Sequence, residues 1–169
     1  MAGNGLMYIA SFNNLSVTNA AQDLWQITAA TTASVLIHSV RVTFTPTITS
    51  GVAQDARYTI GWALRTAAGS GGTAATTTTT GGTQLAPVNK RNSTAPVSTW
   101  TRQVTTINGV GNTLTSDNVS VIVPYERIYT PDQRIVLPAA ASGSYLGLWL
   151  ATAPGAAYSC STEVYFEEI

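Results

Sequence analysis

Apolar and polar residues alternate with a period of two along much of this chain, which is the pattern of half-buried β-strands. The clearest run is RYTIGWALR at residues 57–65. It predicts a strand with an apolar face toward the core and a solvent face with an arginine at each end. The first face holds Tyr58, Ile60, Trp62 and Leu64, and the second holds Arg57, Thr59, Gly61, Ala63 and Arg65.

A second alternating run, SVLIHSVRVTFT at residues 34–45, is long enough for a central strand. Unbroken alternation places Leu36, His38, Val40, Val42 and Phe44 on its apolar face. Shorter strands are predicted at residues 5–12, 23–29, 97–105, 118–123, 133–138, 145–152 and 161–169. Glycine- and proline-containing turns separate most of these runs.

These runs amount to eight to ten short strands, and no stretch has the period of an amphipathic helix. We therefore predict an all-β fold, an antiparallel β-sandwich of the jelly-roll type. An immunoglobulin-like sandwich is disfavoured because the chain has only one cysteine and so lacks the cysteine pair of that fold. Closure into a barrel would produce the same alternation, so a barrel remains an alternative.

The segment GSGGTAATTTTTGGTQLAPVNKRNST, at residues 69–94, interrupts this pattern. The strand ending at Arg65 needs a partner, most simply residues 97–105, so residues 67–96 are predicted to be a long loop inside one domain spanning residues 1–169. We expect Gly69–Gly82 to be flexible and Thr83–Pro96 to be more ordered, docked on its own sheet or on a neighbouring subunit. Deletion of Gly69–Pro96 is expected to leave the fold standing and to weaken assembly.

Charged residues make up only 9% of the chain, against roughly 25% in soluble proteins, and the formal net charge is zero. A neutral surface without mutual repulsion favours a protein that works within an assembly. It also disfavours nucleic acid as a partner, since phosphate binding needs clustered basic residues. Lys90 and Arg91 are the only adjacent basic pair.

Cys160 is the single cysteine, which excludes an internal disulfide and a cysteine-based zinc site. No cofactor motif or calcium-loop spacing is present. The first residues lack the basic and apolar regions of a signal peptide, and no apolar run is long enough for a membrane span. We expect no cofactor, no metal and no membrane partner.

Catalytic chemistry has little support in the pattern. His38 is expected to be a core histidine with locally satisfied nitrogens. Glu163 and Glu167 share a strand face, as a glycosidase pair would, but are better interpreted as charges on the solvent face of an edge strand. We therefore predict that the protein is not an enzyme.

Trp100 follows the long loop and is the best candidate for an exposed tryptophan, at a subunit interface or a glycan site. The ordered half of the loop supplies the other expected interface residues. The predicted interface set is Leu85, Pro87, Val88, Lys90, Arg91 and Trp100.

Three stretches carry a resemblance: residues 7–44, which begin MYIASFNNL, the stretch VPYERIYTPDQRIVLP, and the closing EVYFEEI. Together they resemble a family of small all-β proteins from phage and metagenomic sequences, over most of the chain outside residues 67–95. In composition and fold class the chain is also similar to jelly-roll virion proteins such as capsid decoration or cement proteins.

The absent catalytic constellation, the zero net charge, the Thr-rich composition and the long internal loop agree with what this resemblance implies. We therefore expect a virion structural protein, made in the host cytoplasm, that self-associates and binds a capsid or another particle surface. A trimer is one candidate stoichiometry. Two alternatives remain: a carbohydrate- or receptor-binding module of a tail fibre, and a coat protein that forms the shell itself. The missing basic arm speaks against the coat protein.

Overall fold

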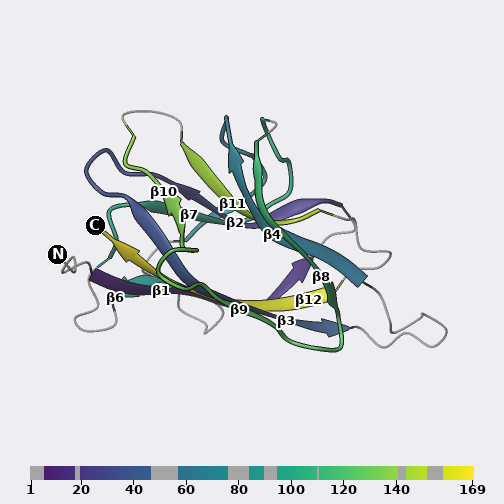
Figure 1. Cartoon of the computed structure of the whole chain (residues 1–169). Helices are drawn as coiled ribbons and strands as arrows, with labels where there is room; N and C mark the ends of the chain where they lie inside the picture. The colour runs from purple at the N-terminus through teal and green to yellow at the C-terminus, as the bar shows by residue number, and fades with distance from the viewer. Residues whose placement is uncertain are drawn as a thin grey trace.

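The chain folds into two antiparallel β-sheets that pack face to face as a sandwich (Figure 1). The computed structural model describes residues 6–17, 20–46, 57–75, 84–89, 95–109, 111–140, 144–151 and 158–169, with side chains for all of these except 14–15, 46 and 84–89. The predicted all-β sandwich is confirmed, and its jelly-roll connectivity stays a prediction. Within the described ranges, no helix is long and apolar enough to cross a membrane.

Sheet A contains the strands from the two ends of the chain. Its order is β10-β3-β12-β1-β6, and β9 also pairs with β3, on the side where β10 lies. The strands are β1 (Leu6–Val17), β3 (Val35–Pro46), β6 (Gln84–Asn89), β9 (Tyr125–Ile128), β10 (Ile135–Leu137) and β12 (Tyr158–Glu168). The final strand is therefore held between β1 and β3, and is not an edge strand as the sequence suggested.

Sheet B has the order β5-β7-β2-β11-β4-β8. Its strands are β2 (Gln22–Thr28), β4 (Arg57–Arg65), β5 (Thr73–Ala74), β7 (Thr99–Val104), β8 (Thr113–Ser120) and β11 (Tyr145–Leu150). The predicted pairing of β4 with β7 is wrong, because β4 lies between β11 and β8, and β7 pairs with β2 and β5.

The low-complexity segment contributes a strand to each sheet. Its first part is held in sheet B, where the backbone of Ser70 exchanges hydrogen bonds with Thr106 and β5 pairs with β7. Its second part forms β6, which pairs with β1 in sheet A. The expected flexibility is wrong for residues 69–75, residues 76–82 lie outside the described residues, and the expected order is confirmed for residues 84–89.

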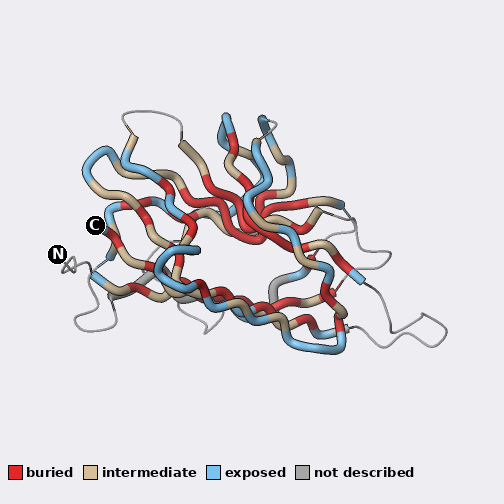
Figure 2. The backbone as a smooth tube through the Cα atoms, in the orientation of Figure 1, coloured by how far each residue is buried: buried red, intermediate tan, exposed pale blue. Residues whose placement is uncertain are grey.

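The core fills the space between the two sheets, and buried segments line their facing sides (Figure 2). Tyr58, Ile60 and Trp62 of β4 lie in it as predicted. An aromatic chain crosses it: Trp25 contacts Trp100 with ring centroids 5.5 Å apart, and Trp100 contacts Phe166 at 4.4 Å. Trp25 also donates from Nε1 to the Thr162 hydroxyl, at 2.8 Å, from one sheet to the other.

A β-bulge in β3 changes the predicted faces of that strand. The register against β12 shifts between Ser39, paired with Tyr165, and Ile37, paired with Phe166, so His38 is the extra residue. Val35 and Ile37 are therefore buried, and the predicted core position of His38 is wrong, because the bulge turns it toward the outer face.

Candidate interaction surface on the outer face of sheet A

The outer face of sheet A carries apolar and charged side chains side by side. In β12 every second residue is buried, so Glu163, Tyr165 and Glu167 point away from the core while Val164 and Phe166 point into it. The shared face of Glu163 and Glu167 is as predicted. Antiparallel pairing then places neighbours from β1, β3 and β9 beside them.

One row across this face is mainly apolar. Ile128 of β9, Ser39 of β3, Tyr165 of β12 and Ile9 of β1 are successive partners in the register. Ile128 is 72% exposed, and the other three are partly exposed. An exposed isoleucine beside a half-exposed tyrosine is typical of a surface that another protein covers.

The next row is polar and alternates in charge. Glu126 of β9, Arg41 of β3, Glu163 of β12 and Ser11 of β1 are successive partners. Among the described residues, Arg41 forms no ion pair within 4.0 Å, although a glutamate lies on each side of it. The row therefore presents one cation between two carboxylates to a partner.

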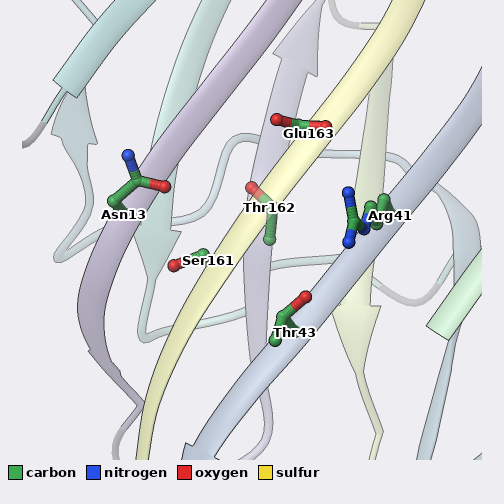
Figure 3. Close-up of a pocket in the computed structure, with 6 residues that line it drawn as sticks. All are labelled: Asn13, Arg41, Thr43, Ser161, Thr162 and Glu163. Carbon is green, nitrogen blue, oxygen red and sulfur yellow. The ribbon is translucent and has the colours of Figure 1, made fainter. Parts of the chain in front are cut away.

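A shallow groove of about 100 Å³ runs across this polar row and the strand positions beside it. Figure 3 shows that its lining residues come from three adjacent strands, β1, β3 and β12. They are Asn13, Arg41, Thr43, Ser161, Thr162 and Glu163. The groove is too small for a drug-sized ligand, whose pockets have about 300 Å³ or more, and suits one inserted side chain.

The bulge adds one side-chain hydrogen bond to this face. His38 Nε2 lies 3.1 Å from Glu167 Oε2, and the two side chains are 19% and 13% exposed. The backbone carbonyl of His38 accepts a hydrogen bond from the Tyr129 amide. The prediction that His38 is satisfied locally is confirmed for Nε2, and its partner is a surface carboxylate.

The structure describes some of the predicted interface residues and not others. Leu85, Pro87 and Val88 belong to β6, whose backbone pairs with β1, so they lie at the edge of the same sheet, and their side chains are outside the described residues. Lys90 and Arg91 are also outside the described residues. No finding tests their role at an interface.

The expected exposure of Trp100 is wrong. Its side chain is 3% exposed because its ring packs between Trp25 and Phe166. Its Nε1 donates to the Ser98 hydroxyl, which in turn donates to Glu168. A ring enclosed in this way has no free face for a sugar, which removes the reason for the glycan alternative.

Sequence patterns missed the residues that make this surface. Glu126 and Ile128 lie in one run of the chain and Arg41 in another, and only the sheet register brings them together. One signal was available: YERI begins with an aromatic residue, ends with a β-branched one and precedes a turn, as a short strand can.

Two other charged clusters lie away from this face. Arg65 of β4 pairs with Asp23 of β2 at 2.7 Å, and both side chains are almost fully buried. Arg127 and Tyr125 of β9 both donate to Asp117 of β8, where the chain passes from one sheet to the other. Within the described part of the chain, no group of three or more His, Cys, Asp or Glu residues is placed to hold a metal ion.

Buried ionisable groups have shifted pKa values that fit structural roles. Burial raises the pKa of Asp23, against the opposing effect of Arg65. Burial also raises the pKa of the Cys160 thiol to about 12, so the thiolate needed for nucleophilic chemistry is scarce at neutral pH. At the partly exposed Arg127, the hydrogen bond to Asp117 raises the pKa of the guanidinium.

Comparison with known proteins adds no relative from which a role for this surface could be inferred. No family model, no curated protein and no solved structure matches the chain.

Proposed function

We propose that this chain is a non-enzymatic virion structural protein, of the kind that decorates or cements a capsid, and that it works through protein–protein contact at the outer face of sheet A. The supporting observation is that face itself, where exposed Ile128 lies next to an alternating row of Glu126, Arg41 and Glu163. Such a mixture of apolar and charged groups suits a protein partner better than a small substrate.

The construction of the sheet supports the same proposal. β12 lies in the middle of sheet A and is bonded on both sides, so side chains on its outer face are held on a rigid support. Residues presented by a fixed register lose little conformational freedom when a partner binds. The low fraction of charged residues and the zero net charge agree with a protein packed among others.

Binding to capsids tests the proposal directly. If the gene lies beside genes for a major capsid protein and a large terminase, shells assembled from that capsid protein should carry this protein down on sedimentation. Ile128→Asp should reduce co-sedimentation at least about tenfold, since it places a charge where apolar surface is buried.

Ile122→Asp is the matched control, because Ile122 is also an exposed isoleucine, at 60%, but lies in the turn after β8. It should co-sediment like the wild-type protein. Failure of the wild-type protein to co-sediment with the shells would overturn the proposal, and equal binding by both variants would exclude this face.

A further inference from the structure

We infer that the partner on the outer face of sheet A is a second copy of this chain, related by a two-fold axis that runs along the strands between β3 and β12. This inference rests on the proposed function, in that it assigns the protein–protein contact at this face to self-association, so that the dimer is the form that binds the shell. The basis of the inference is the order of residues in the two rows described above. When the face packs against its own copy, that order places complementary residues opposite each other.

Rotation about this axis places each row of the copy over the same row of the first chain, with its residues in the reverse order. Residues of β3 then face residues of β12 in the copy, and residues of β9 face residues of β1. In the polar row, Arg41 meets the copy's Glu163, and Glu163 meets the copy's Arg41. Two symmetric opposite-charge contacts form, adjacent to the axis where the two faces are held most closely.

The neighbouring rows agree with this arrangement. Ile128 lies over the copy's Ile9, which places apolar side chains together, and Tyr165 lies over the copy's Ser39. Beyond the bulge, Val136 of β10 lies over the copy's Met7. This axis therefore pairs opposite charges in the polar row and apolar positions at Ile128 with Ile9 and at Val136 with Met7, while Leu36 lies over the copy's Glu167.

Three other axes along the strands fail on the charges, and an axis between β3 and β9, which pairs Arg41 with the copy's Glu126, carries β12 with Glu163 past the edge of the copy's sheet. An axis through β12 places Glu163 against the copy's Glu163, and an axis through β3 places Arg41 against the copy's Arg41. An axis between β12 and β1 carries Arg41 over β6, at the register position of Leu85. Like charges or an unpaired charged residue would disfavour each of these arrangements.

The shapes also fit. Rotation by 180° about an axis along the strands preserves the hand of the sheet twist, so two copies of this twisted face stay evenly spaced. Stacked sheets lie about 10 Å apart, which accommodates one layer of interleaved side chains from each copy. The shallow groove between Arg41 and Ser161 offers room for such a side chain.

The area of this face indicates how stable a dimer to expect. Four strands at about 4.8 Å spacing and a length of up to about 36 Å for β12 give on the order of 700 Å² on each copy. This is slightly below the roughly 800 Å² per partner of a standard interface. We therefore expect a reversible dimer that is seen at high protein concentration.

Charge exchange between the two copies provides the test, with analytical ultracentrifugation of the full chain and no capsid present. Arg41→Glu places two glutamates opposite each other twice in the dimer, and Glu163→Arg does the same with two arginines. Each variant alone should dimerise at least about tenfold more weakly than wild type. An equal mixture of the two should dimerise about as well as wild type, because both contacts then join opposite charges.

Glu126→Arg is the matched control, because Glu126 flanks Arg41 on the other side but lies over the copy's Ser11. Its mixture with Arg41→Glu should not restore dimerisation. A second readout is a disulfide between Ile9→Cys and Ile128→Cys chains, with buried Cys160 as an unreactive background.

Three results would overturn the inference: a wild-type protein that stays monomeric at millimolar concentration, single variants that dimerise normally, or a mixture that remains monomeric. Circular dichroism of each variant shows whether its fold is intact. Because no capsid is present, these outcomes are separate from the co-sedimentation test. A wild-type protein that stays monomeric and still binds shells would refute the dimer and leave the proposed function standing.

Discussion

The buried ion pair between Arg65 and Asp23 is the clearest case in which one residue departs from its expected setting. Arg65 was expected on the solvent face of β4, yet only 6% of its side chain is exposed. Its guanidinium donates to both carboxylate oxygens of Asp23 and lies 5.2 Å from the Trp149 ring. Asp23 in turn packs over Gly147, where a side chain would overlap the carboxylate.

Replacing Arg65 should therefore be much more costly than replacing the arginine at the other end of the same strand. Arg65→Gln leaves the Asp23 carboxylate buried without its cation, and should lower the free energy of unfolding by about 3 kcal/mol at pH 7. Arg57→Gln, at an exposed position, should cause no measurable change. Urea unfolding of both variants checks this, and equal stability of the two would contradict it.

The effect of Arg65→Gln should depend on pH. Burial already raises the pKa of Asp23 above 3.8, so the folded state binds that proton more tightly than the unfolded state, and the resulting stability is lost as the pH rises through the raised pKa. Arg65 lowers the pKa of Asp23, so without Arg65 this pKa is higher and the loss of stability extends to higher pH. The deficit relative to wild type should shrink as the pH falls toward about 4, and urea titrations at several pH values would show a constant deficit if this is wrong.

At the scale of elements, Glu168 joins the last strand to the segment that leads into β7. Its carboxylate accepts hydrogen bonds from the amides of Val97 and Ser98, each at 2.9 Å, and from the Ser98 hydroxyl. The side chain is largely buried. This contact ties the end of sheet A to the start of a strand in sheet B, and it positions the residue that holds the Trp100 indole.

Glu168→Gln should loosen this connection. An amide side chain cannot accept at its nitrogen, so one buried amide donor loses its partner, and the free energy of unfolding should fall by about 1–3 kcal/mol. Glu167→Gln is a control one residue away, on the outer face, where the amide can still bond to His38. Denaturant unfolding at low protein concentration should separate the two variants, and equal losses would contradict the assignment.

At the scale of the whole molecule, the low-complexity segment is part of both sheets. The sequence suggested that deleting Gly69–Pro96 would leave the fold standing. Because β5 pairs with β7 and β6 pairs with β1, the deletion would remove an edge strand from each sheet and expose two new edges.

We therefore expect the deletion variant to be destabilised and to aggregate. Circular dichroism, thermal unfolding and light scattering check this outcome. A variant with the wild-type midpoint that stays in solution would show that β5 and β6 contribute little to the fold.

The local pattern was enough to predict an element wherever the alternation runs unbroken. Tyr58, Ile60 and Trp62 lie in the core, and Glu163 shares an outward face with Glu167, because side-chain direction in a regular strand follows from sequence spacing alone. The all-β sandwich followed from many such runs. The candidate surface did not, because no single run contains more than a part of it.

Tertiary structure decided everything that depends on which strands are neighbours. It placed β12 at the centre of sheet A, drew β6 from a segment that looked like a loop, and turned His38 outward with one bulge. It also enclosed Trp100 and brought Arg41 between two glutamates. The physical reason is that alternation records only whether a residue faces in or out, whereas partners and burial are set by contacts between residues far apart in the chain.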